Sequence, residues 1–216
     1  YLTNTLDDSH FQRNPLFPYI SDEGEQATAV KMTKKIWVVL GNPPYSNYSK
    51  NKSAFIQNLV ADYKKGLQES KINLDDDYIK FIRFAQAKIE GAKYTYLKGD
   101  NPVTGKIESA NQGIIGIITN NSYLYGVTHR QMRKSLLETF DKIYIINLHG
   151  NSIIGEQDKN VFDIMIGVSI AIFIKTTKPL KKKEVYYYST LENGILTRTG
   201  KDEYLYNHDL KTVEWT

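Results

Sequence analysis

Four consecutive residues, Asn42-Pro-Pro-Tyr45, carry groups that could bind a planar amine. Proline fixes φ at about −65°, has no N–H group and restricts the residue before it. The two prolines therefore present the carbonyl groups of Asn42 and Pro43 in a fixed direction, without a competing backbone donor. The amide oxygen of Asn42 adds a further acceptor, and Tyr45 adds an aromatic face.

Such a pocket complements an NH₂ group on a heteroaromatic ring, because this group has two hydrogens to donate. The amine is a poor nucleophile, since its lone pair is delocalised into the ring. Two rigid acceptors can pull the hydrogens out of the plane and localise the lone pair on nitrogen, so that no general base is required. The simpler interpretation is a rigid turn that closes a strand, because Asn and Pro are common in turns.

The order of apolar and polar segments predicts an α/β fold with a mostly parallel sheet. Residues 36–40 are continuously apolar, which predicts a central strand covered on both faces. The tetrapeptide follows the carboxyl end of this strand, where ligands bind in open α/β sheets. Further strands are predicted at 113–119, 142–148, 168–175 and 184–189, and helices at 53–66, 78–90 and 130–140.

The segments between these elements are interpreted from their composition. Residues 1–35 read as loop with short helical pieces, and the polar stretch around Asn101-Pro and Thr104-Gly reads as loop. Residues 148–168 lack helical periodicity, so the strands on either side are predicted to run antiparallel. The chain turns basic and Tyr-rich towards its end, which predicts a boundary near residue 180.

Composition excludes several classes of protein. The chain has 216 residues, a net charge of +4 and 41% hydrophobic residues, which excludes disorder, collagen and coiled-coil arrays. It has no Cys, and its four histidines share no metal-ligand spacing, so no metal site is predicted. The longest apolar run, 164–174, is too short to span a bilayer, which argues against a membrane protein. The pI of about 8.9 slightly favours a polyanionic partner.

Gly41-Asn-Pro-Pro-Tyr-Ser46 resembles the catalytic motif of amino-group DNA methyltransferases of the adenine-N6 type. Together with later segments, it resembles the methylase section of large single-chain bacterial restriction-modification enzymes, the type ISP group. The fold implied is the C-terminal part of a Rossmann-like methyltransferase sheet, mostly parallel with one antiparallel strand. The later segments are Asp77–Ala85, Gly116–Tyr123, Met132–Leu137, Asp141–Gly150, Asn160–Ile164 and Gly167–Val168.

The resemblance implies a role for each matching residue. Asn42 and Pro43 would accept hydrogen bonds from the N6 amine of adenine. Pro44 would hold the loop, and Tyr45 would stack on the flipped base. Phe162 matches the aromatic residue that stacks on the other face of that base. The implied partner is double-stranded DNA with a flipped adenine, as chemistry on a base requires, and the implied compartment is the bacterial cytoplasm.

The family uses S-adenosylmethionine as its methyl donor, and here the chain departs from the family. The family binds this cofactor through a glycine-rich turn upstream of the catalytic motif, but the fourteen glycines contain no Gly-x-Gly. The chain begins at Tyr1 rather than Met, and Tyr1–Leu6 resembles the stretch between the cofactor motifs and the catalytic motif. We therefore expect a piece of a longer protein, inactive alone and unable to bind S-adenosylmethionine measurably.

The expected division of the chain follows from this resemblance. Residues 1–180 would be the substrate half of the methyltransferase domain, and residues 181–216 a connector towards a target-recognition module. The remainder of the parent chain would supply the cofactor half, target recognition, and nuclease or translocase modules. 

Other functions also fit the tetrapeptide. A related Asn-Pro-Pro-Tyr methyltransferase could act on protein glutamine or RNA guanine, because these also present a planar amide or amine. The segments downstream of the tetrapeptide favour DNA. The chain could instead be a DNA-docking module without catalysis.

Charged runs have two interpretations each. Arg130, Arg133 and Lys134 lie at the start of a predicted helix, where they could contact DNA phosphates or form an ordinary exposed face. Asp75–Asp77 could form a carboxylate cluster, but its place before an apolar helical stripe favours helix capping.

Overall fold

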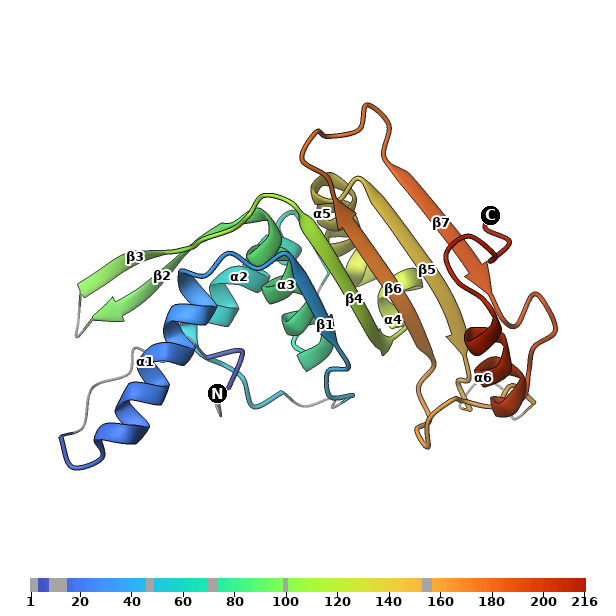
Figure 1. The fold of residues 1–216 in the computed structure, drawn as a ribbon, viewed down its shortest axis with the longest axis horizontal. Coiled ribbons are helices and arrows are strands. Elements are labelled where there is room, and N and C mark those ends of the chain that lie inside the picture. The colour runs from blue at the N-terminus through green and yellow to red at the C-terminus, as the bar shows by residue number, and fades with distance from the viewer. Residues whose placement is uncertain (1–3, 8–14, 46–48, 70–73, 99–100, 153–156) are drawn as a thin grey trace.

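The apolar segments form a central sheet, and amphipathic segments form helices that cover one of its faces (Figure 1). The structure, a computed structural model, describes residues 4–7, 15–45, 49–69, 74–98 (backbone only at 96–98), 101–152 and 157–216. The strands are β1 (Val38–Gly41), β2 (Ala92–Lys98), β3 (Asn101–Ile107), β4 (Gly113–Asn120), β5 (Lys142–His149), β6 (Val168–Lys175) and β7 (Glu184–Ser189). The helices are α1 (Pro18–Met32), α2 (Ala54–Lys64), α3 (Asp77–Glu90), α4 (Ser122–Tyr125), α5 (Arg130–Thr139) and α6 (Arg198–Asn207), with a 3₁₀ turn η1 (Val127–His129).

The main sheet has the strand order β1-β4-β6-β5-β7. β1 pairs with β4, and β7 with β5, in parallel, whereas β6 runs antiparallel to both β4 and β5. The prediction of an α/β fold with a mostly parallel sheet and one antiparallel strand is confirmed. β6 reverses direction because its connection to β5 has no helix among its described residues, and crossovers between parallel strands usually contain one.

The hydrophobic core lies between one face of this sheet and helices α2, α3 and α5. Alternate residues of β4, such as Ile115 and Ile117, are buried towards these helices. Phe173 of β6 packs against Phe140 at the end of α5, with 5.3 Å between the ring centroids. The apolar residues of α3 recur every three or four positions, so that one side of this helix joins the core.

Residues 36–40 do not form the central, doubly covered strand that the sequence predicts. Among the described residues β1 pairs with β4 alone, at one end of the sheet. Val38 is 56% exposed and Leu40 is 76% exposed, while Val39 packs against the core. An apolar run indicates that a segment tends to be buried, but it does not show which other elements would pack against it.

Two segments are more regular than their sequences indicate: residues 1–35, which read as loop with short helical pieces, and the polar stretch around Asn101-Pro and Thr104-Gly, which reads as loop. Pro18–Met32 is one helix, α1, which begins with its proline at the first turn, where proline is tolerated. Its polar sequence obscures it, because few of its side chains are buried. Residues 92–98 and 101–107 form an antiparallel hairpin, and the Tyr94 ring lies so close to Gly105 that a Cβ there would come within 2.4 Å.

Residues 181–216, expected to be a connector, contain β7 and α6. β7 pairs with β5 in the main sheet, and the boundary near residue 180 stays a prediction. Within the described ranges, every helix is too short or too polar to cross a bilayer.

Asp141, directly before β5, binds the connection between β6 and β7. Its buried carboxylate accepts hydrogen bonds from Thr176 after β6, from the Leu180 amide and from Lys183 before β7. Burial raises the pKa of this carboxyl, but the hydrogen bonds from Lys183, Thr176 and Leu180 outweigh it and hold the pKa well below its usual range.

Replacing Asp141 by Asn should therefore destabilise the fold by about 2 kcal/mol at neutral pH, because charge-assisted bonds are lost. The pKa of Asp141 is lower in the folded than in the unfolded protein, so its carboxylate stabilises the fold at pH values above the unfolded pKa. The difference in unfolding free energy between wild type and D141N should therefore narrow as the pH falls below about 4. Thermal unfolding of wild type, D141N and the exposed control Asp202→Asn, measured from pH 7 to pH 3, tests this. If wild type and D141N differ in stability by the same amount at every pH, the Asp141 carboxylate is not the stabilising group.

Candidate active site

The Asn42-Pro-Pro-Tyr45 tetrapeptide directly follows β1, at the carboxyl edge of the parallel strands. Asn42 and Pro44 are exposed, whereas Pro43 is buried. Nothing in the described part of the chain hydrogen-bonds to the side chain of Asn42, so its amide oxygen is free to accept from a ligand.

Tyr45 and Phe162 lie side by side although they are far apart in the sequence. Their ring centroids are 5.9 Å apart and their planes are tilted by 52°. The loop that carries Phe162 joins the end of β5 to the start of β6, and β6 and β1 flank β4 in the sheet. The sheet topology therefore brings this loop to the edge where β1 ends.

The Tyr45 hydroxyl is buried and has no hydrogen-bond partner among the described residues. Burial raises the pKa of Tyr45 to about 12, so this phenol is neutral at physiological pH. It contributes an uncharged aromatic surface to the site.

The loop between β5 and β6 is organised around Asn160, which is buried. The Asn160 amide donates to the carbonyls of Gly150 and Ile166, at 2.9 and 2.8 Å, and its oxygen accepts from the Phe162 amide at 3.0 Å. Gly150 has a φ of +81°, and a Cβ there would lie 2.4 Å from the Cα of Asn160. A single buried side chain thus fixes both ends of the loop and the backbone of Phe162.

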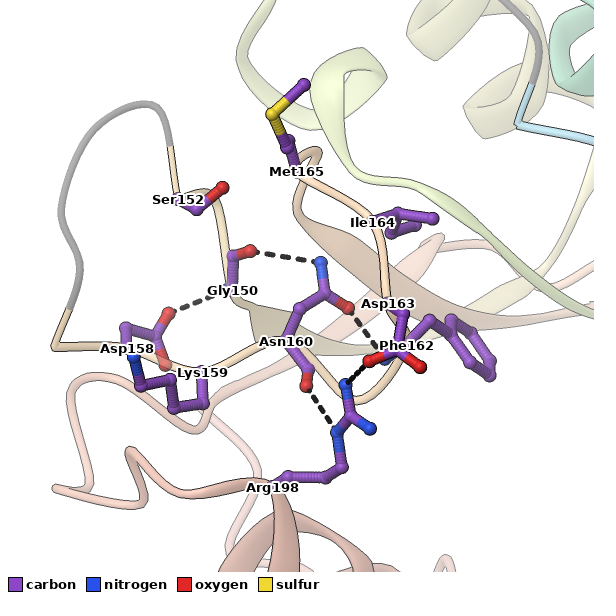
Figure 2. A pocket seen from close by; sticks show the side chains of 10 residues that line it. All are labelled: Gly150, Ser152, Asp158, Lys159, Asn160, Phe162, Asp163, Ile164, Met165 and Arg198. Atoms are coloured by element: carbon purple, nitrogen blue, oxygen red, sulfur yellow. Dashed lines mark hydrogen bonds and ion pairs between the residues drawn. The ribbon is translucent and has the colours of Figure 1, made fainter.

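A pocket of about 770 Å³ opens beside Phe162 (Figure 2). Charged side chains and apolar ones both line it, which suits a ligand with a flat apolar body and polar edges. The lining includes Asp158, Lys159, Phe162, Asp163, Met165 and Arg198.

Ser49 and Asn51, which follow the tetrapeptide by a few residues, are held by α3. The Asp77 carboxylate accepts from Ser49 Oγ at 2.5 Å and from Asn51 Nδ2 at 2.8 Å. Lys80 Nζ donates to Ser49 Oγ and to the Asn51 carbonyl, at 2.8 and 2.7 Å. Lys80 is fully buried, and this burial lowers the pKa of its ammonium. Ser49 and Asn51 are therefore anchored to α3.

The capping prediction for Asp75–Asp77 is wrong in its mechanism. Asp76 occupies the N-cap position of α3, but its side chain makes no capping hydrogen bond. Asp77 binds the loop at Ser49 and Asn51 instead. Lys80 was missed as a supporting residue, and the signal that could have found it is a lysine within the apolar stripe of α3.

The basic residues expected near DNA are engaged within the protein. Arg130 forms an ion pair with Glu69, and Lys134 lies 3.8 Å from Glu138. Arg133 donates to the carbonyl of Tyr123 within α4 at 2.7 Å and to the carbonyl of Gly126 directly after it at 2.8 Å. In the described part of the chain none of the three lines the Phe162 pocket, and contact with DNA stays a prediction.

The residues next to β1 do not suit S-adenosylmethionine. A groove of about 360 Å³ lies beside this strand, and its described lining is mainly apolar, with Lys31 and Lys88 as the charged members. It includes no carboxylate that could bind the ribose hydroxyls. Across the described ranges there is also no group of three or more His, Asp or Glu residues that could hold a metal ion.

Comparison with known proteins relates the fold to three solved structures. No protein-family model matches the chain, and no curated protein matches it either. The chain is similar to the ATP-dependent type ISP restriction-modification enzyme LlaBIII bound to DNA, with 26% identity over 94% of this chain and a TM-score of 0.70. It shares its fold with the DrdV–DNA complex (21% identity over 98% of this chain, TM-score 0.71). It also shares it with a nuclease-deletion mutant of the type ISP enzyme LlaGI in complex with a DNA substrate mimic (19% identity over 98%, TM-score 0.72). The chain spans 13%, 20% and 19% of those three chains, so its fold corresponds to one section of much longer proteins.

Proposed function

We propose that this chain is the substrate-binding part of a site-specific DNA adenine-N6 methyltransferase within a restriction-modification enzyme. In this proposal the chain belongs to a longer protein, the parent enzyme. The observation that carries the proposal is the convergence of two features at one edge of the sheet. Asn42, whose side chain is exposed, lies three residues before Tyr45, and the Tyr45 ring contacts Phe162 from a distant part of the chain.

The geometry suits a flat base with an exocyclic amine. A base between two rings needs about 7 Å, twice the optimal contact of ~3.5 Å between carbon atoms. The Tyr45 and Phe162 centroids are 5.9 Å apart and the ring planes are tilted by 52°, so a base would be admitted by a small separation of the rings together with a rotation towards parallel. Once the base is stacked, the acceptors of Asn42 and Pro43 would receive the two hydrogens of its amine.

The acceptors have a catalytic consequence as well as a binding one. Hydrogen bonds from the amine to the oxygens of Asn42 and Pro43 pull its hydrogens out of the ring plane and localise the lone pair on nitrogen. The neutral Tyr45 adds no charge that would compete for the amine hydrogens. This is stabilisation by preoriented dipoles, and the amine becomes a nucleophile without a general base.

The donor in this proposal is S-adenosylmethionine, which supplies an electrophilic methyl group when bound. Its determinants would lie in other parts of the parent enzyme, since the described residues beside β1 do not suit it. Two observations support a cofactor half that lies outside this chain. The side chains of Val38 and Leu40 in β1 are exposed, and one side of that strand is unpaired in the described sheet.

The similarity to LlaBIII, a restriction-modification enzyme bound to DNA, favours DNA over the other substrates that fit the tetrapeptide. The experiment is a methyl-transfer assay of the parent enzyme with labelled S-adenosylmethionine on duplex DNA, structured RNA and a release-factor protein. We expect label in the DNA and N6-methyladenine after its digestion. Label in RNA guanine or protein glutamine, with none in DNA, would replace the proposed substrate.

A further inference from the structure

Helix α6 carries two basic residues near its N-terminus, the end of a helix where positive charge is unfavourable. Arg198 and Lys201 lie in its first turns, and no acidic residue accompanies them in the first turn. The N-terminus of a helix bears partial positive charge, so cations there are destabilising. Their position calls for negative partners from elsewhere in the fold.

Those partners come from the loop that carries Phe162. Arg198 Nη2 lies 2.6 Å from Asp163, and Arg198 Nε donates to the Asn160 carbonyl at 3.0 Å. Figure 2 shows Arg198 extending from its helix between Asn160 and Asp163, with Phe162 beside them. The two contacts lie on either side of Phe162 in the sequence.

Lys201 makes the second connection, and it is fully buried. Its ammonium pairs with Asp158 and donates to the Lys159 carbonyl at 2.7 Å. Asp158 in turn accepts from the Gly150 amide at 2.6 Å, at the start of the loop. A buried ammonium in this position needs such partners, because an unpaired buried charge is strongly destabilising.

Helix α6 is also attached to the main sheet. Tyr204 stacks on Tyr188 of β7, with 4.7 Å between ring centroids and 9° between planes. Tyr188 is buried. The helix therefore connects a rigid strand to the loop between β5 and β6, and it can define where that loop lies relative to the sheet.

We propose that α6 positions Phe162 for base stacking through Arg198 and Lys201, an inference that rests on the proposed function. Neither residue touches the base in this scheme. Both act on the loop backbone and on the aspartates that flank Phe162, so they set the separation and tilt of the two rings. A displacement of about 1 Å at a reacting group can cost about 100-fold in rate.

The test uses variants of the parent enzyme. Arg198→Met and Lys201→Met should each lower kcat for DNA methylation between about 10- and 100-fold, while the KM for DNA stays within about twofold. Arg198 is partly exposed, so its variant should fold even if the Lys201 variant does not. Lys211→Met, an exposed lysine in the same C-terminal segment, is the matched control and should leave kcat unchanged.

A double-mutant cycle separates positioning from general damage. If Arg198 acts through Phe162, adding Arg198→Met to Phe162→Ala should cause no further loss, because the group it positions is already absent. Losses that multiply, or unchanged kcat in both α6 variants, overturn the proposal. If methylation requires Asn42 and Phe162 but tolerates both α6 variants, this inference alone fails. If the parent enzyme does not methylate DNA, the proposed function fails and this inference fails with it.

Discussion

Replacing Asn42 by Ala in the parent enzyme is expected to lower the kcat for DNA methylation by about 100- to 1000-fold, the usual effect of losing one preoriented polar group in a site of this type. The side chain is exposed and makes no hydrogen bond to the described residues, so its removal should not affect folding. The loss should appear in kcat, because the amine depends on this acceptor most strongly as its lone pair localises. Steady-state kinetics and DNA binding, measured on the same preparation, test the prediction.

Asn42→Asp is the matched control. It keeps an acceptor oxygen at the same place, so it should retain more activity than Asn42→Ala, although its charge changes the field at the amine. If Asn42→Ala methylates DNA at the wild-type rate, the tetrapeptide is only a turn. The DNA-docking interpretation would then be favoured.

Replacing Phe162 by Ala is expected to lower methylation by roughly 10- to 100-fold, since base–aromatic stacking contributes about 1–3 kcal/mol per base. The ring contacts Tyr45 and lines the pocket, so its loss removes one face of the base site. Fluorescence of 2-aminopurine at the target position would report the flipped base directly. We expect the Phe162→Ala variant to lower both kcat and the fluorescence of the flipped 2-aminopurine.

Two variants complete the Phe162 series. Phe162→Trp keeps an aromatic face and should retain most of the activity. Phe17→Ala removes a phenylalanine that is 57% exposed before α1, and it should have no effect. Equal activity of Phe162→Ala and Phe17→Ala would remove Phe162 from the base site.

Much of the secondary structure could be predicted from local patterns. Strands β4 to β7 and helices α2, α3 and α5 appear within a few residues of their predicted bounds, because their apolar periods are strong. The sequence indicates only short helical pieces where the polar helix α1 forms, and it indicates loop where the hairpin β2–β3 forms. Their sequences contain proline and glycine, which indicate turns locally, and the positions these residues occupy in the elements become clear only after folding.

The sequence by itself determined the chemistry that the tetrapeptide can offer. Two adjacent prolines restrict the backbone by local sterics, so the direction of the Asn42 and Pro43 carbonyls depends on neighbouring residues alone. The antiparallel direction of β6 also followed from the sequence, because the connection before it has no helical period.

The family resemblance already implied that Phe162 lies opposite Tyr45 across a base, and the two rings are neighbours in the structure. Only the tertiary structure decided which groups support them. It made Asp77 and Lys80 partners of Ser49, and it paired α6 with the aspartates beside Phe162. It also placed β1 at one end of the described sheet. These outcomes depend on strand order and on the choice of charged partners, which short-range periodicity does not encode.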